Sequence, residues 1–399
     1  MEITTFDIIW RQQIRYVIFG QFIIICMLDM SDPYWPLILS SSHSFDSKTL
    51  QYWSGVIYMA PLLTTIITTF LWIKLGERIG YKKMILRAGF ALAATQWSLF
   101  FFSNPWFILL IRLMQGALAG FSTAAQAWSL AITPINTHSQ VIGRLQAATA
   151  LGSIIGPICG GFISHYFSYL AIFITAGCVC LLISIALANY LQENTNVQPI
   201  TSEKKIQKTF FLEPQKNLLL FLIGSAQAAR WMSTPFFALY AAERLHASTL
   251  ALGLIYALIA FAMSLTTPSL GWIVDRRSPR FTFTKYVLAG SFLLSGAIQW
   301  GYAYTAEIYF AFILSLFLGV CLGVTALLLF SFLLQDAEEN RGKLIGLGNT
   351  ALKFGNLIGI IIGTVIQAQY NFLISFLFIG FFYFVLAVLT MRYKPEIVV

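Results

Sequence analysis

The sequence predicts an all-α polytopic membrane protein with twelve transmembrane helices in two six-helix bundles. Three observations predict this fold: the composition, the lengths of the apolar runs, and a repeat between the two halves. The chain is 58% hydrophobic and 10% charged, with a mean hydropathy of +0.76, whereas soluble domains are about half apolar and about a quarter charged. This composition excludes an ordinary soluble domain.

Twelve apolar runs are long enough to cross a bilayer core, which takes about 20 residues. The first run follows Arg11 and Arg15 as a signal peptide would, but it is too long, is interrupted by charge and lacks a small-residue cleavage site. We therefore expect it to be a retained helix. In chain order the runs cover residues 16–38, 52–73, 84–103, 106–129, 142–164, 169–190, 218–240, 250–273, 284–304, 308–333, 345–367 and 371–391.

The lysines and arginines favour an orientation with both termini in the cytoplasm. Under that orientation 20 of the 25 lie on the inner side, and Lys48 and Arg244 lie in outer loops. The remaining three, Arg112, Arg230 and Lys353, lie within spans. Such an excess in the inner loops follows the positive-inside rule. Topology therefore explains the net charge of +9, and no basic patch is left to indicate a nucleic-acid partner.

The two halves of the chain repeat one another. Residues 191–216 form the longest polar interval and are the expected linker between an N-terminal bundle (1–190) and a C-terminal bundle (217–399). A shift of 203 residues places Gly116, Gly120, Gly143, Gly152, Gly156 and Gly160 on Gly319, Gly323, Gly346, Gly355, Gly359 and Gly363. The inner loop at 73–83 has a looser echo at 271–280. Two parallel six-span repeats are typical of a transporter with its substrate site between them.

Three motifs lie on this pattern. The loop after the second span holds Gly76, Glu77, Arg78, Gly80, Lys82 and Lys83. The fourth span carries Arg112 with Gln115 and Gly116. The fifth span carries GSIIGPICGG, with Gly152, Gly156, Pro157, Gly160 and Gly161 at its defining positions. With these motifs the chain resembles the major facilitator superfamily, and within it the twelve-span drug:proton antiporters, which include multidrug and siderophore exporters of bacterial inner membranes.

The resemblance implies a direction of transport and a set of gate residues. In this family GSIIGPICGG separates exporters from importers, and the match is complete. The inner-loop motif departs from the family pattern, with Glu77 for Asp and Ile73 for the first Gly. By analogy Glu77 would latch the inner gate onto the N-terminus of the eleventh span, since helix N-termini carry about half a positive charge. Asp275 and Arg276 are the inner-gate residues of the second half. Alternatively, the basic residues of these loops only determine topology.

The glycines of residues 152–161 recur every four positions and make a flat helix face that another backbone can approach closely. Pro157 removes one helical hydrogen bond and bends the helix. An ordinary close-packed membrane helix is the alternative. We favour a hinge and seal between the two halves, with the bend mainly in the fifth span, because the eleventh has Ile360 in place of the proline.

Two carboxylates lie within the first span, in CMLDMSDPYWP. Each charge at the bilayer centre costs at least about 2.5 to 3.5 kcal/mol, so such residues are rare and usually functional. Asp29 and Asp32 lie three residues apart and are expected on one helix face, with Asp32 at the depth of Arg112. Two carboxylates beside one arginine are suited to carry a single exchangeable proton.

We therefore expect Asp32, Asp29 and Arg112 to couple transport to protons. The family resemblance supports Asp32, because some drug:proton antiporters have an acid four positions before the first-span proline, here Pro36. The alternative is a structural ion pair of Asp32 with Arg112, and a solvated Asp29. Coupling to sodium also stays open.

The second half contributes cations without matching acids. Arg230 lies near the middle of the seventh span and Lys353 near the middle of the eleventh, and neither span contains an acid. If the acids of the first half serve protons and Arg112, these cations indicate a ligand with carboxylates, such as a citrate-type siderophore. The expected substrate-binding residues are Arg230, Lys353, Gln115, Gln227, Asn356 and Trp35.

The sequence thus predicts a proton antiporter that exports a small molecule across the inner membrane by alternating access, as a monomer. A symporter that imports a siderophore or nutrient is the alternative within transport, and a polytopic membrane enzyme is the alternative of another class. No nucleophile motif and no metal-ligand spacing appears in the sequence, so no cofactor or metal is expected. The five cysteines lie in apolar spans and are expected to pack. The expected partners are the substrate, protons and the lipid bilayer.

Overall fold

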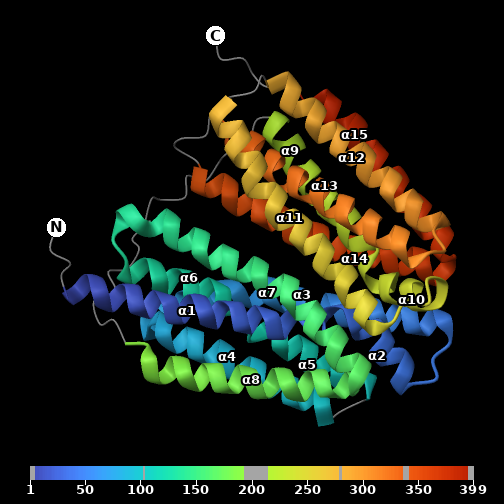
Figure 1. The fold of residues 1–399 in the computed structure, drawn as a ribbon. Coiled ribbons are helices and arrows are strands. Elements are labelled where there is room, and N and C mark those ends of the chain that lie inside the picture. The colour runs from blue at the N-terminus through green and yellow to red at the C-terminus, as the bar shows by residue number, and fades with distance from the viewer. Residues whose placement is uncertain (1–4, 102–103, 193–213, 278–280, 336–340, 394–399) are drawn as a thin grey trace. The chain divides into compact units, whose positions relative to one another are not determined.

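The computed structural model describes residues 5–101, 104–192, 214–277, 281–335 and 341–393, and in this part the chain forms helices joined by short connections (Figure 1). Ten helical segments of the described residues are long and apolar enough to cross a membrane. Each of the twelve predicted spans coincides with one helix or with two or three consecutive helices. The predicted all-α membrane fold is confirmed.

The helices of the first six spans are α1 (Thr5–Asp29), η1 (Asp32–Tyr34), α2 (Trp35–Ser42), α3 (Ser47–Ile79), α4 (Tyr81–Phe101), α5 (Pro105–Ala117), α6 (Phe121–Ile132), η2 (Ile135–Thr137), α7 (His138–Tyr166) and α8 (Tyr169–Tyr190). Those of the last six spans are α9 (Pro214–Met232), α10 (Thr234–Arg244), α11 (Thr249–Arg277), α12 (Phe281–Tyr304), α13 (Ile308–Leu334), α14 (Arg341–Gln369) and α15 (Phe372–Arg392).

The chain packs as two compact units. Unit 1 comprises Met1–Trp35 and Ala60–Ile206, and unit 2 comprises Pro36–Met59 and Gln207–Val399. The predicted linker, residues 191–216, lies mostly outside the described residues, so the two predicted bundle boundaries stay a prediction.

The glycine repeat of the sequence is a repeat of helix contacts within each unit. In unit 1 the α7 glycines at 152, 156 and 160 face the backbone of α1 at Phe22, Cys26 and Met30. In unit 2 the α14 glycines at 355, 359 and 363 face the backbone of α9 at Gly224, Ala228 and Met232. The contacted residues of α9 follow those of α1 by 202 positions, and the glycines of α14 follow those of α7 by 203 positions. Whole helix pairs are therefore repeated, and not only the glycines.

The first and seventh spans are interrupted at equivalent positions. Ser31 precedes η1 and Ser233 precedes α10, and each is followed two residues later by a proline, which lacks the N–H that a continuous helix needs. The Tyr34 N–H donates to the Ser31 carbonyl at 3.1 Å, and the Phe236 N–H donates to the Ser233 carbonyl at 3.2 Å. The predicted first span is present, and its α-helix is interrupted where its acidic residues lie.

Candidate functional site

The two aspartates flank the break in the first span. Asp29 is the last residue of α1 and Asp32 is the first of η1. Both side chains are partly buried, and their carboxylates lie close enough to interact electrostatically. The two aspartates lie on either side of a turn, where the Met30 N–H still donates to the Cys26 carbonyl at 3.0 Å.

Arg112 of α5 lies beside this break. Its side chain is buried, and the guanidinium interacts electrostatically with Asp32. The Nη1 atom donates to Oε1 of Gln115 at 2.7 Å, and the guanidinium carbon lies 4.7 Å from the centroid of the Trp35 ring. Gln115 and Trp35, expected to bind substrate, thus both contact Arg112. Unit 1 brings these five residues, Asp29 included, into one cluster, and the role of each remains a prediction.

α7 ties this cluster to the glycine motif. The Ser153 hydroxyl donates to Oδ2 of Asp29, and the Tyr34 hydroxyl donates to the Pro157 carbonyl at 2.9 Å. Sequence reasoning missed the role of Ser153, although it lies inside GSIIGPICGG and three residues before Gly156. That spacing on a helix facing α1 was the signal available.

The glycine face of α7 is covered by α1 of the same unit. A Cβ at Gly156 would lie 2.6 Å from the Cys26 carbonyl oxygen and 3.2 Å from the Asp29 Cβ, and one at Gly160 would overlap the Met30 carbonyl oxygen. These glycines therefore pack α7 against α1 within unit 1, and the expected hinge and seal between the two halves stays a prediction. The absence of Cβ atoms lets α1 approach, which brings the end of α1 against α7. Gly161 is buried as well.

The cations of unit 2 lie on α9 and α14. Arg230 and Lys353 are partly buried, and neither forms an ion pair with another described residue. Arg230 interacts electrostatically with Tyr383 of α15, a residue that sequence reasoning missed and whose buried hydroxyl has no hydrogen-bond partner in the described part of the chain. α9 and α14 carry no acidic residue. Both cations are therefore available to a negatively charged group.

Each of these cations has an amide one helical turn away on its own helix. Gln227 precedes Arg230, and Asn356 follows Lys353. The Gln227 Oε1 and Asn356 Oδ1 atoms are buried, and neither has a hydrogen-bond partner among the described residues. A buried acceptor left unsatisfied costs about 1–3 kcal/mol. A Cβ at Gly355 would lie 3.0 Å from the Gln227 Cβ, so these amides border the contact between α9 and α14.

The inner-loop motif builds a tight turn between α3 and α4. Gly80 has a φ of 95°, a left-handed conformation that favours glycine, and its N–H donates to the Gly76 carbonyl at 3.0 Å. Glu77 is exposed. Arg78 and Lys83 are also exposed, Lys82 is partly buried, and Arg276 stacks over Trp272 at 4.5 Å. The Asp275 side chain lies outside the described part. The turn explains the glycines, and the gate role of Glu77 stays a prediction.

In the part of the chain that the structure describes, no group of three or more His, Cys, Asp or Glu side chains is arranged to hold a metal ion. A multi-pass α-helical membrane protein of two repeated units, with ionisable residues inside its spans, is the class that this fold and site define.

Comparison with known families makes this class specific. The sequence profile of the Major Facilitator Superfamily matches residues 17–335 and, in a second match, 219–398. The chain belongs to the major facilitator superfamily and is a transporter rather than an enzyme. The resemblance inferred from the three motifs is confirmed.

Similarity to individual proteins supports the same family. The chain is 31% identical to the staphyloferrin B transporter of Staphylococcus aureus over 221 residues, which cover 54% of this chain and 53% of that one. The match thus spans about half of that relative. Identity is 23% to an uncharacterized MFS-type transporter, YuxJ of Bacillus subtilis, over 92% of this chain and 94% of that one. It is 26% to the multi-drug resistance efflux pump PmrA of Streptococcus pneumoniae, over 68% and 69%.

Solved structures share the fold at low identity. A bacterial homolog of the human lysosomal transporter Spinster, inward-facing and unoccupied, aligns with a TM-score of 0.72 and 11% identity over 97% of this chain and 99% of that one. The POT family transporter PepTSo aligns with a TM-score of 0.74 and 10% identity over 96% and 97%. At these identities the likeness shows the fold alone.

Proposed function

We propose that this chain is a proton-coupled antiporter that exports a small molecule across the inner membrane by alternating access, with both termini in the cytoplasm. The observation that carries the proposal is the cluster in unit 1, where Asp29 and Asp32 lie at a break in the first span and Arg112 lies beside Asp32. A proton changes the charge of such a cluster, and hence the attraction between the break and α5.

The coupling follows from that change of charge. Protonation of Asp32, with Asp29 assisting, weakens its hold on Arg112 and lowers the affinity for substrate in the outward state, and loss of the proton inward resets the cluster. A proton can drive such a cycle only if the two conformations bind it with different free energies. Ser153 and Gln115 hold the two ends of the cluster through one hydrogen bond each.

The substrate we propose is a small molecule with several carboxylates and with hydrogen-bond donors, such as a hydroxycarboxylate siderophore. Arg230 and Lys353 supply positive charge without an acid on their helices, and Gln227 and Asn356 supply buried acceptors that have no donor among the residues described by the structure. A lipophilic cation would match neither pair. The similarity to a staphyloferrin B transporter supports a siderophore, and the similarity to multidrug pumps keeps drug-like compounds as the competing class.

We further propose that the repeats move against one another as the sequence predicts, with bundles at 1–190 and 217–399 joined by the linker. Glu77 would then close the inner side, as the family analogy implies. Its exposure and its place at the end of α3 support a role on the inner surface.

The test is transport by the purified chain in proteoliposomes under an imposed pH gradient. A citrate-type siderophore and a lipophilic cationic dye are offered in parallel, and the internal pH is followed together with substrate movement. We expect the siderophore to move against the protons that enter. Co-movement of siderophore and protons in one direction would replace antiport by symport. Movement of the dye alone would refute the carboxylate substrate, and movement of neither would refute the proposed function.

A further inference from the structure

The fourth span is interrupted at its middle, in unit 1. α5 ends at Ala117 and α6 begins at Phe121, and the intervening Gly120 has a φ of 117°. A break inside a membrane frees backbone carbonyls that cannot turn to water, so neighbouring side chains must satisfy them.

Three side chains of α3 and α4 donate to the carbonyls at this break. The pairs are Thr65 Oγ1 to Gly116 (3.0 Å), Trp72 Nε1 to Ala117 (2.6 Å) and Arg87 Nη2 to Ala119 (3.0 Å). The guanidinium carbon of Arg87 also lies 3.5 Å from the centroid of the Trp72 ring. Trp72 and Arg87 thus form one clamp, stacked on each other and bonded to the same stretch of backbone.

Among its described residues, unit 2 has neither the break nor the clamp. Its equivalent helix, α13, runs without interruption over Ile308–Leu334. Gly116 contacts Pro61 and the equivalent Gly319 contacts Ile259, which sets a shift of 198 residues between α3 and α11. Likewise, Gly177 contacts Trp97 and Gly380 contacts Trp300, which sets a shift of 203 residues between α4 and α12. These shifts place Met263, Leu270 and Gly290 where unit 1 has Thr65, Trp72 and Arg87. The clamp therefore occurs in the unit that carries the acidic pair.

Capping a helix break with an arginine is energetically unfavourable. Its Nε and Nη1 atoms are buried, and neither has a hydrogen-bond partner in the described part of the chain. Charged donors buried without partners are destabilising. The hydroxyl of Thr65 caps a neighbouring carbonyl without that penalty, so satisfying the backbone does not by itself require a guanidinium here.

We propose that Arg87, held on the Trp72 ring, is a positioning residue for proton coupling. By fixing the backbone at Ala119 it fixes the end of α5, and with it the place of Arg112, which lies five residues before that end. Arg87 does not contact the proton itself. The inference rests on the proposed function, because it assigns Arg87 a task at the Asp32–Arg112 pair.

The two helices on either side of the break contain one ionisable side chain. α5 carries no ionisable side chain besides Arg112, and α6 carries none. The titratable and charged residues of the neighbouring elements are Asp7, Arg11, Arg15, Tyr16, Cys26 and Asp29 of α1, Tyr34 of η1, His138, Arg144, Cys159, His165 and Tyr166 of α7, and Tyr169, Cys178, Cys180 and Tyr190 of α8. Tyr81, Lys82 and Lys83 lie on α4 at its start, about one to two turns before Arg87. A change in the pH profile on altering Arg87 would therefore report on the acidic cluster.

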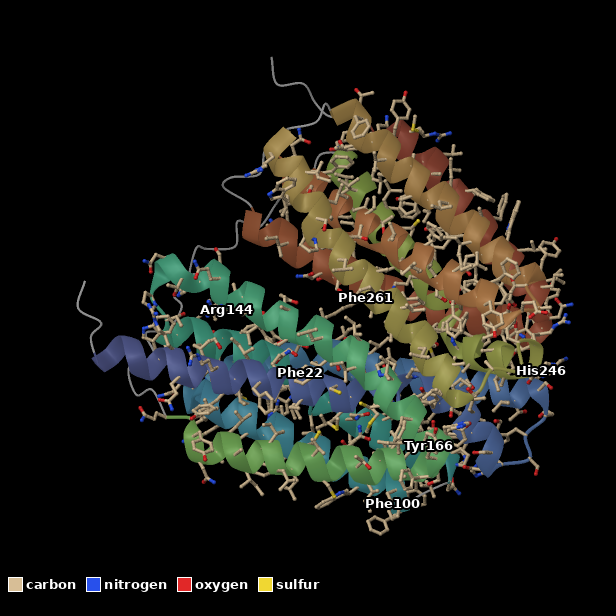
Figure 2. The ribbon with its side chains drawn as sticks, in the orientation of Figure 1. Phe22, Phe100, Arg144, Tyr166, His246 and Phe261 are labelled. Atoms are coloured by element: carbon tan, nitrogen blue, oxygen red, sulfur yellow. The ribbon has the colours of Figure 1, made fainter. Side chains whose placement is uncertain are left out.

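The experiment compares the pH dependence of proton-driven transport in Arg87→Met, in the conservative Arg87→Lys and in the wild type. Arg144→Met is the matched control, because Arg144 is an exposed arginine near the start of α7 in the same unit (Figure 2). Flux is divided by the amount of monodisperse protein, and Tm is recorded for each variant. We expect Arg87→Met to move the pH midpoint upward by about one unit, as a tenfold weaker hold of Arg112 on charged Asp32 would. Arg87→Lys should move it less, and Arg144→Met should leave it unchanged.

An unchanged midpoint in Arg87→Met, with flux lost only in proportion to folded protein, would overturn the inference and leave the clamp a structural cap. An equal shift in Arg144→Met would also overturn it. If Arg87→Met does not fold, the pH midpoint of Trp72→Phe is measured in its place. This variant keeps a ring for stacking but removes the donor to the Ala117 carbonyl. Absence of any proton dependence in the wild type would instead refute the proposed function, so the two failures are distinguishable.

Discussion

The helix pair α1–α7 of unit 1 and the pair α9–α14 of unit 2 share their backbone contacts but not their polar residues. Glycines at the same spacing face carbonyls at the same spacing, and a serine–proline break follows in both. The positions Asp29, Asp32, Tyr34, Arg112 and Ser153 of unit 1 correspond to Trp231, Thr234, Phe236, Ser315 and Asn356 of unit 2, and Arg230 and Lys353 of unit 2 correspond to Leu28 and Ala150 of unit 1. The two units therefore share their helix packing and differ in their charged residues.

This difference separates the residues that pack the two helix pairs from the residues that carry charge. Close contact between helices depends on missing Cβ atoms, and it tolerates any side chain that points away from the contact. One unit carries two acids and an arginine, which we propose respond to a proton, and the other carries two cations, which we propose bind an anion. Four predictions test this division.

The largest effect is expected from replacing Asp32, the residue that we propose carries the proton. The equivalent residue of unit 2, Thr234, provides the control. Asp32→Asn should abolish proton-driven transport, because the variant has no carboxylate to exchange a proton beside Arg112. Thr234→Asn, at the same place in unit 2, should leave coupling intact. Flux under an imposed pH gradient measures both. Equal losses in the two variants would show that the break, and not its charge, matters.

Next in size is the loss of positive charge from unit 2. Arg230→Gln and Lys353→Gln should each weaken binding of a polycarboxylate roughly ten- to hundredfold, since hydrogen bonds to charged groups contribute about 1.5–3 kcal/mol. Arg244→Gln, at an exposed position of α10, is the control. Titration calorimetry in detergent gives Kd. Unchanged affinity in both variants would make these cations structural.

The glycines should affect stability alike in both units. Gly160→Ala and Gly363→Ala each place a Cβ on a carbonyl oxygen, of Met30 and Met232 respectively, and overpacking of this kind costs about 1–3 kcal/mol. Thermal unfolding in detergent measures the loss. Gly143→Ala and Gly346→Ala are the matched controls, because a Cβ at either glycine would meet nothing within 4 Å. Destabilisation at only one of Gly160 and Gly363 would contradict the repeated packing.

The smallest effect concerns one hydrogen bond that unit 2 lacks. Tyr34→Phe gives unit 1 the residue that unit 2 has at Phe236 and removes the bond to the Pro157 carbonyl. The expected loss of stability is about 0.5–1.5 kcal/mol. Tyr166→Phe on α7 is the control, because that tyrosine is exposed (Figure 2). Equal Tm values for both variants would remove Tyr34 from the features that distinguish the units.

The candidate site was only partly accessible to sequence reasoning. The buried acids and cations could be named because a charge in an apolar run stands out against its neighbours. Ser153, Tyr383 and the clamp of Trp72 and Arg87 could not, because serine, tyrosine and tryptophan are ordinary in membrane helices and Arg87 reads as one more inner-side cation. The interruption of the fourth span was equally hidden, since its residues remain apolar through Leu118, Ala119 and Gly120.

The sequence by itself determined the class, the spans and the repeat. A bilayer core demands about 20 apolar residues and satisfied backbone bonds from every span, so each helix is specified by its own residues. The tertiary structure decided which surface each glycine faces, where Asp29, Asp32 and Arg112 meet, and which side chains cap a broken helix. Those depend on the rotation of each helix about its axis and on its neighbours, and both are set by packing between segments far apart in the chain.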